Sequence, residues 1–327
     1  MTKIDAHVHI RTEDPAVMEF AKSEGFRLIT INTRSDSQEN IDEQRHFAMT
    51  MNELYPEEIS WLATFSMENF EDPGWSDGVI QKLREDLDNG AVGFKVWKDI
   101  GMTFRDSLGR FLFLDDPLFE PILEFMAGSG FTLLTHIGEP KNCWLPIDSM
   151  TVNSDKSYFR ENPQYHMYLH PEYPSYERLI RSRDNVLSGY PGLRMVGAHL
   201  GSLEWDVDEL AKRLDSYPNF AVDLAARVCH LQVQDREKVR NFIIRYQDRI
   251  LYATDMSVAG ENFEERRAWI ENEWRSDWAY FATDSLMGSP NVENDFRGLD
   301  LSEEVLRKIF YSNAIAWYPG AFGQHSP

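Results

Sequence analysis

The chain has 327 residues, of which 42% are hydrophobic and 27% are charged, enough for one (β/α) barrel or for two ordinary domains. Its formal net charge of −21 argues against nucleic acid and anionic membrane surfaces as partners. The two cysteines, Cys143 and Cys229, match neither a zinc-finger spacing nor a disulfide framework.

No run approaches 18 apolar residues, so we expect no transmembrane helix. The first predicted strand begins almost at the N-terminus and leaves no room for a signal peptide. We therefore expect a soluble, cytoplasmic protein, although a chain from which a leader had been removed would look the same.

Short apolar segments rich in β-forming residues recur along the chain and are predicted as strands. They cover residues 4–10, 26–33, 59–67, 91–97, 131–138, 194–201, 220–226 and 250–256. Nearly continuous apolar runs of this length are typical of strands that are buried on both faces.

Helical segments lie between these strands. They are predicted at 15–25, 40–56, 79–90, 115–130, 206–218, 235–249 and 301–319. Their ends carry the expected signals: Pro15 lies in a first turn, Gly90 closes a helix, Asp115 or Asp116 caps the fourth, and Ser302 caps the last.

Eight strands that alternate with helices predict an α/β fold, a (β/α)8 TIM barrel, formed as one domain over residues 1–327. A doubly wound sheet is the alternative. Two connections are long, from about residue 138 to 192 and from about 257 to 300. In a barrel both follow the carboxyl end of a strand, where active sites lie, so we predict a lid insertion after strand 5 and a second long loop after strand 8.

Ionisable side chains stand near the carboxyl ends of several predicted strands. His7 and His9 are two residues apart on the first strand and would share one face. His136 ends the fifth strand, His199 the sixth and Asp255 the eighth. Such ends converge on one mouth of a barrel, and imidazole and carboxylate suit zinc and similar divalent ions. We therefore predict a metal site.

On these residues the sequence resembles the amidohydrolase superfamily, whose members are metal-dependent (β/α)8 barrels. The first-strand His-x-His matches His7 and His9, the strand 5 and 6 histidines match His136 and His199, and the strand 8 aspartate matches Asp255. The last helical segment resembles that of the branch with metal-dependent decarboxylases and lactonases.

Lys95 of the fourth strand also fits a superfamily position, the lysine that two-metal members carboxylate so that the carbamate bridges the ions. It would then be a metal ligand. The alternative is an ammonium paired with a carboxylate, with one ion and His199 as an acid/base group. The cofactor is therefore expected to be one or two divalent ions, zinc in the first place and manganese as the alternative.

We expect Asp255 to act as both ligand and base, as the family's aspartate does, and to pass the proton of an activated water to the leaving group. His199 would be the second catalytic residue. Loop residues after the strands are candidates for substrate binding, namely Arg34, Lys98, Glu139, Trp144 and Arg227. For each cation the alternative is a solvated or ion-paired side chain, and Trp144 could instead pack the lid.

The resulting hypothesis is a metal-dependent hydrolase that cleaves a small, anionic lactone, ester or amide. A mononuclear non-oxidative decarboxylase of a small carboxylate is the second hypothesis, and a non-catalytic barrel that binds a ligand is the third. The expected partner is a small-molecule substrate, and the sequence leaves a homo-oligomer open.

Overall fold

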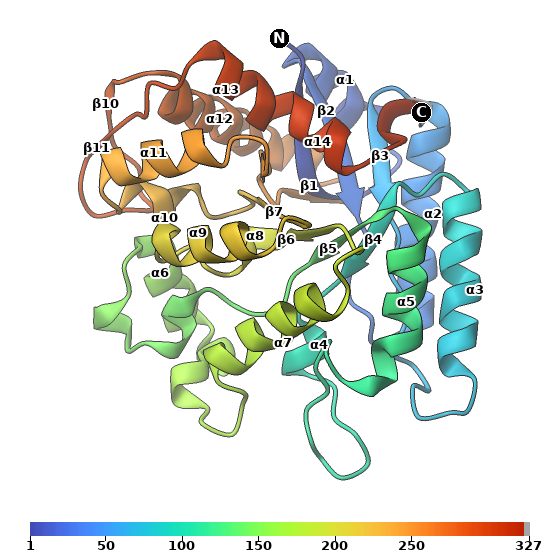
Figure 1. The fold of residues 1–327 in the computed structure, drawn as a ribbon. Coiled ribbons are helices and arrows are strands. Elements are labelled where there is room, and N and C mark those ends of the chain that lie inside the picture. Colours follow the sequence, from blue (N-terminus) through green and yellow to red (C-terminus); the bar gives the residue numbers. More distant parts are fainter. Residues whose placement is uncertain (324–327) are drawn as a thin grey trace.

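A computed structural model describes residues 1–323 and has a core of parallel strands surrounded by helices (Figure 1). The barrel strands are β1 (Lys3–Arg11), β2 (Phe26–Ile31), β3 (Ile59–Leu62), β4 (Gly93–Val96), β5 (Thr132–Thr135), β6 (Met195–Gly197), β7 (Phe220–Asp223) and β8 (Ile250–Leu251). All eight lie within the predicted segments, apart from one residue at each end of β1, and most are shorter than predicted.

The strands form two parallel sheets, β9-β1-β2-β3 and β4-β5-β6-β7-β8, where β9 (Ser257–Ala259) continues beyond β8 and pairs with β1. Backbone hydrogen bonds join both seams. The Lys95 amide donates to the Ala63 carbonyl over 2.7 Å, and the Ala6 amide donates to the Tyr252 carbonyl over 3.0 Å. The predicted TIM barrel is thus confirmed.

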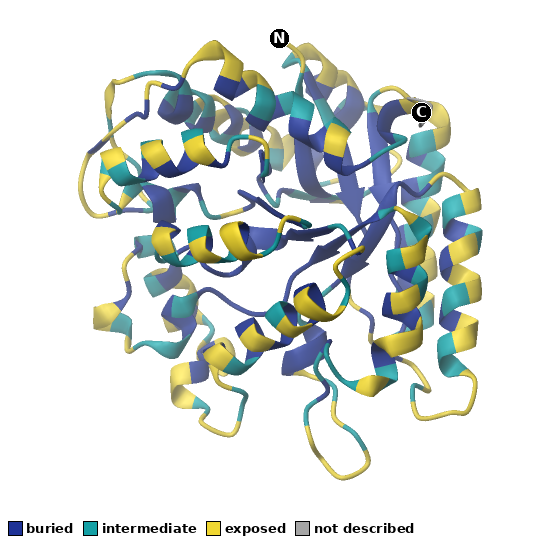
Figure 2. Ribbon diagram, in the orientation of Figure 1, coloured by how far each residue is buried: buried dark blue, intermediate teal, exposed yellow. Residues whose placement is uncertain are grey.

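The helices cover the outside of the strands, and their exposed faces point away from the buried sheet (Figure 2). The longer ones are α1 (Pro15–Ser23), α2 (Gln38–Leu54), α3 (Trp75–Asp88), α5 (Glu120–Ser129), α6 (Asn153–Glu161), α7 (Tyr176–Gly189), α9 (Val207–Ser216), α11 (Arg236–Arg245) and α12 (Phe263–Ala282). The short ones are α4 (Asp99–Met102), α8 (Ala198–Gly201), α10 (Val228–Gln232), α13 (Glu303–Arg307) and α14 (Asn313–Trp317), with a π-helical turn at Lys308–Ser312 between the last two.

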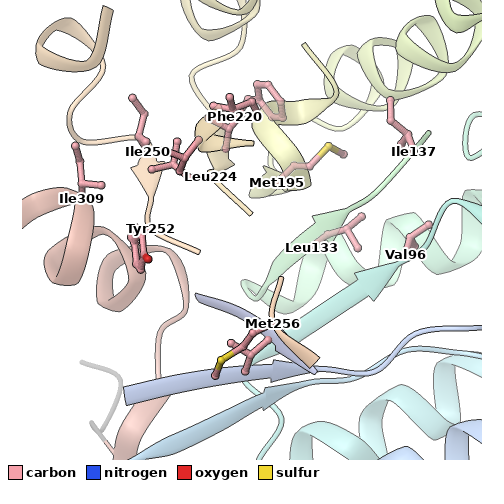
Figure 3. Packing of buried hydrophobic residues seen from close by; sticks show 14 of the residues in the cluster. Val96, Leu133, Ile137, Met195, Phe220, Leu224, Ile250, Tyr252, Met256 and Ile309 are labelled. Carbon is pink, nitrogen blue, oxygen red and sulfur yellow. The ribbon is translucent and has the colours of Figure 1, made fainter. Parts of the chain in front are cut away.

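Side-chain alternation divides the buried strand residues into two hydrophobic clusters. Leu133 and Met195 belong to the larger cluster between strands and helices (Figure 3), whereas their neighbours Leu134 and Val196 belong to a second cluster inside the barrel. The same alternation places Lys95 opposite Phe94 and Val96, which pack in the outer cluster, so that Lys95 faces the interior.

The C-terminal segment closes the amino end of the barrel. Asn313 donates to the Ile250 carbonyl over 2.7 Å, the Thr132 hydroxyl donates to the Trp317 carbonyl, and the Phe322 amide donates to Ser60 over 2.8 Å. These contacts reach the first residues of β8 and β5 and the second residue of β3. Trp317, Tyr318 and Phe322 complete the inner hydrophobic cluster and form its floor.

The two long connections contain more regular structure than we expected. The first holds the barrel helix α7 and, before it, the segment 139–175 with α6 and four short 3-10 helices; we call this segment the lid. The second holds the 20-residue helix α12 and the antiparallel pair β10 (Leu286–Met287) and β11 (Phe296–Arg297). Within residues 1–323, every helix falls short of the length and apolarity that a membrane crossing requires.

Candidate metal centre and adjoining pocket

The strand ends that carry ionisable residues leave regular geometry. After β2, β6, β7 and β8 the first non-glycine residues with positive φ angles are Arg34 (62°), His199 (59°), Ala226 (53°) and Asp255 (67°). This conformation costs L-residues about 1–2 kcal/mol each, and such strain concentrates at functional sites. The predicted strands 6 and 8 therefore end early, and the chain turns sharply at His199 and Asp255.

The turn after β6 shows how this strain is held. His199, Leu200, Gly201 and Ser202 all have positive φ. The Asp223 carboxylate accepts the His199 amide over 2.7 Å, and Arg183 donates to the Gly201 carbonyl. These hydrogen bonds provide partners for the His199 amide and the Gly201 carbonyl, two buried backbone groups in the turn. They also fix the direction of the His199 side chain.

His7, His199 and Asp255 come together at the mouth. One ligand atom of each lies within 4.8 Å of those of the other two. Asp255 Oδ1 lies 3.3 Å from His7 Nε2 and 3.1 Å from His9 Nε2, so both histidines of the first strand face the same carboxylate. The Asp255 side chain is 31% exposed, whereas that of His7 is 1% exposed. A molecule in the mouth can therefore reach Asp255.

The ring nitrogens that face away from this group are fixed by buried acceptors. His7 Nδ1 lies 2.7 Å from Asp223 Oδ2, and His199 Nδ1 lies 2.8 Å from the Ala225 carbonyl. Both rings thus keep their Nε2 atoms directed toward Asp255. Asp223 was not among the predicted site residues, although its position at the end of the seventh apolar strand is the same kind of position as those of the predicted ligands.

Burial keeps the neighbouring imidazoles neutral. It lowers the pKa of His9, lowers that of His136 well below its ordinary value, and lowers that of His199 to about 3. Burial alone would raise the pKa of Asp255, but the hydrogen bond with His9 and the nearby imidazoles lower it below the ordinary value. Neutral imidazoles and an ionised carboxylate are the forms that bind metal ions.

These residues fit a divalent cation. His199 Nε2 and His9 Nδ1 are buried without a hydrogen-bond partner among the described residues. Such atoms normally have a partner, and a cation would supply one. Two imidazoles and a carboxylate also match the ligand set of many catalytic zinc sites.

The structure places His136 and Lys95 beside this group. The His136 ring centroid lies 4.2 Å from that of His199, but its Nε2 lies 3.1 Å from the Gly138 carbonyl. Lys95 is fully buried, and its Nζ has no hydrogen-bond partner among residues 1–323. Burial lowers the pKa of Lys95 to about 8, even though Asp223, Asp255 and Asp99 oppose the shift.

A pocket of about 470 Å3 opens between the strand ends and the lid. Three of the predicted substrate-binding residues line it, Arg34, Lys98 and Glu139. Lys98 and Glu139 form an ion pair, whereas the exposed Arg34 has no ion pair among the described residues. The lid contributes Tyr158 and Tyr165 among others. The pocket can therefore hold a planar molecule with an anionic group.

The two other predicted substrate-binding residues lie elsewhere. The Trp144 ring packs 5.5 Å from that of Tyr176, and its Nε1 donates to the Pro174 carbonyl, which supports the alternative of lid packing. Arg227 follows β7 and is half-buried. Its charge helps to lower the pKa values of His136 and His199, after burial as the main cause.

Several solved structures share this fold. The chain resembles 2,6-dihydroxybenzoate decarboxylase from Rhizobium (TM-score 0.57, 15% identity, 97% of this chain and 98% of that one). It also resembles 5-carboxyvanillate decarboxylase from Sphingomonas paucimobilis (0.52, 12%, 97% and 98%) and a putative 2-pyrone-4,6-dicarboxylic acid hydrolase from Pseudomonas putida (0.52, 13%, 97% and 97%).

No curated protein matches the chain significantly in sequence. The family model described as amidohydrolase, however, matches residues 4–320. This match spans all eight barrel strands and the helices around them. The chain belongs to the amidohydrolase family.

Proposed function

We propose that this protein is a metal-dependent hydrolase whose single barrel domain cleaves a lactone, ester or amide bond in a small anionic substrate. The observation that carries the proposal is the convergence of His7, His199 and Asp255, at the carboxyl end of the barrel where a pocket lined by Arg34 and by the Lys98–Glu139 ion pair also opens. His7, His9, His199 and Asp255 would hold the ion, with zinc as the expected metal. His136 and Lys95 would be the further ligands where a second ion is bound. When bound, a divalent cation polarises the scissile carbonyl and makes hydroxide available near neutral pH.

Asp255 is the residue that would move the proton. Its carboxylate touches His7 and His9 but remains partly exposed to the mouth. It can accept the proton of the attacking water and return it to the leaving group, as a general base and then a general acid. His199 has Nδ1 fixed on the Ala225 carbonyl and so has only Nε2 to offer. In the arrangement proposed above Nε2 would bind the ion, and the alternative is that the other residues hold the ion and Nε2 acts on the reacting group.

The substrate is expected to be anionic because Arg34 lines the pocket without an ion pair among the described residues and Arg227 follows β7. An arginine without an ion pair can bind a carboxylate through two parallel hydrogen bonds. The lid tyrosines Tyr158 and Tyr165 offer surfaces for a planar ring.

Non-oxidative decarboxylation is the second candidate. Two of the resembling structures are decarboxylases, and their TM-scores equal or exceed that of the hydrolase. The same residues would serve this reaction: the ionised Asp255 would take a proton from water and pass it to the carbon from which carbon dioxide leaves, and the remaining hydroxide would combine with carbon dioxide as bicarbonate.

One experiment separates the two reactions. Protein purified without chelators is loaded with zinc or manganese and incubated with a panel of lactones and esters and, separately, with 2,6-dihydroxybenzoate and 5-carboxyvanillate. Hydrolysis is followed by acid release and decarboxylation by carbon dioxide release. Turnover of a lactone or ester without carbon dioxide supports the proposal, and carbon dioxide release alone supports the second candidate. Equal results from Asp255→Asn and parent protein would contradict both.

A further inference from the structure

The lid carries a buried carboxylate, Asp155, that the proposed chemistry does not use. It lies in the first turn of α6, where a negative charge is favourable, and is only 8% exposed. A buried carboxylate is costly unless charged or polar groups surround it. Its partners therefore indicate what it holds together.

Asp155 joins three segments that are far apart in the sequence. Asn142 Nδ2, in the loop after β5, donates to Asp155 Oδ2 over 2.8 Å. His230 Nε2, in α10 after β7, lies 3.3 Å from the same oxygen, an electrostatic contact whose geometry does not make a hydrogen bond. Asn142 also accepts the Thr151 amide over 3.3 Å, just before α6. Figure 1 shows α6 next to α10 on the outside of the barrel.

The residues just before α10 connect this contact to the proposed site. Arg227 precedes α10, and its carbonyl accepts the His230 amide over 3.0 Å. Two residues earlier, the Ala225 carbonyl holds His199 Nδ1. A displacement of α10 would therefore move Arg227 and the acceptor that orients His199.

The charges agree with this connection. Burial lowers the pKa of Arg227, but the carboxylate of Asp155, followed by that of Glu204, reverses the shift and raises it. Arg227 Nε is buried without a hydrogen-bond partner among the described residues, and Nη1 donates only to the adjacent Ala226 carbonyl. The carboxylates of Asp155 and Glu204 thus stabilise the charge of Arg227, and no ion pair among the described residues occupies its remaining donors.

We propose that Asp155 is a positioning residue that latches the lid helix α6 to α10 through His230 and so holds Arg227 in place for the anionic group of the substrate. The role of Arg227 in this inference rests on the proposed function. The latch itself is a contact between two helices and can be tested without turnover.

The variants are Asp155→Ala, His230→Ala and the double variant, with Asp148→Ala as the control. Asp148 is an exposed carboxylate of the same lid. Amide hydrogen exchange is measured over residues 152–161 and 226–232. We expect each single variant to speed exchange in both segments about tenfold, and the double variant to add little to Asp155→Ala, because both single variants remove the same contact between Asp155 and His230. Asp155→Asn, which keeps the shape, serves if Asp155→Ala does not fold.

The effect on Arg227 is read by phenylglyoxal labelling and peptide mass spectrometry. We expect severalfold faster labelling of Arg227 in the Asp155 variants and unchanged labelling of Arg34, which lies across the mouth. For any substrate that is turned over, Asp155→Asn should raise KM more than it lowers kcat. Faster exchange confined to α6, with α10 and Arg227 as in the parent, would overturn the proposal. Failure to find hydrolysis would overturn only the proposed function.

Discussion

His7 Nδ1 and Asp223 Oδ2 lie 2.7 Å apart in a fully buried pair, although 216 residues separate them in the sequence. The contact fixes the His7 ring and leaves Nε2 for a metal ion. Asp223→Asn should therefore lower zinc affinity by about 10–100-fold, the usual effect of removing the group that orients a histidine ligand. Competition with a chromogenic chelator measures it. Asp208→Asn, at an exposed site, should bind zinc like the parent, and an equal affinity in Asp223→Asn would contradict the role.

His7 itself is expected to be a ligand. Protein purified without chelators should hold about one to two equivalents of zinc or manganese, and His7→Ala should lower both metal content and turnover. Mass spectrometry of the digested protein gives the metal content. His46→Ala is a matched control, because that imidazole is 68% exposed and pairs only with Glu13 among the described residues. Parent-like metal content in His7→Ala would mean that the first strand holds no ion.

Asp255→Asn separates binding of the ion from proton transfer. The amide keeps the shape and one oxygen ligand but cannot accept a proton near neutral pH. We expect kcat to fall about 10²–10⁴-fold, with a smaller change in KM and a nearly unchanged melting temperature. The measurement is the rate at several pH values for protein with verified metal content. If Asp255→Asn keeps the parental kcat with the ion bound, another residue must be the general base, and His199 would be the first candidate.

If Lys95 is carboxylated, as the lysine at this position is in the two-metal members of the superfamily, it should bridge two ions. Its buried Nζ has no hydrogen-bond partner among residues 1–323. Reaction of Nζ with carbon dioxide would form a carbamate, whose oxygens could bind the ions. Parent protein supplied with bicarbonate should hold about two equivalents of metal, and Lys95→Met about one. Electron density should extend beyond Nζ. A free ammonium with one ion in the parent would favour the single-ion arrangement with His199 as the acid/base group.

Asp86 should make stability depend on pH. Burial raises its pKa from 3.8 to about 6, despite the ion pair with Arg45. Between these values the carboxyl is ionised only in the unfolded chain, which therefore binds fewer protons, and stability falls as pH rises. Above about pH 6 the penalty is at most ~3 kcal/mol. Between pH 4 and 7 the free energy of unfolding of Asp86→Asn, measured by denaturant titration, should increase relative to that of the parent as pH rises. The exposed Asp88→Asn should not.

The strands and much of the site follow from the sequence because local patterns determine them. His7, His9, His199 and Asp255 stand at the ends of apolar runs, and a barrel brings such ends together whatever the loops do. Asp223 was missed because its partners, His7 and the His199 amide, come from other strands. Only the assembled barrel reveals why a carboxylate is buried there.

The lid and α12 were harder to predict. In α12 the buried residues include Asp277 among Phe263, Ile270, Trp274 and Tyr280, so the apolar spacing is broken by a buried acid. That acid accepts the Tyr252 hydroxyl over 3.0 Å, a contact between distant elements. Trp144 gave an ambiguous signal for a similar reason, because its neighbour Tyr176 becomes adjacent only when the lid folds back.

Trp317, Tyr318 and Phe322 close the barrel at its amino end, so that the interior opens toward the carboxyl end of the strands. A small molecule must therefore reach the metal centre, and leave it, along one route past the lid. A product molecule that dissociates slowly occupies this route and excludes the next substrate molecule, so we expect competitive product inhibition.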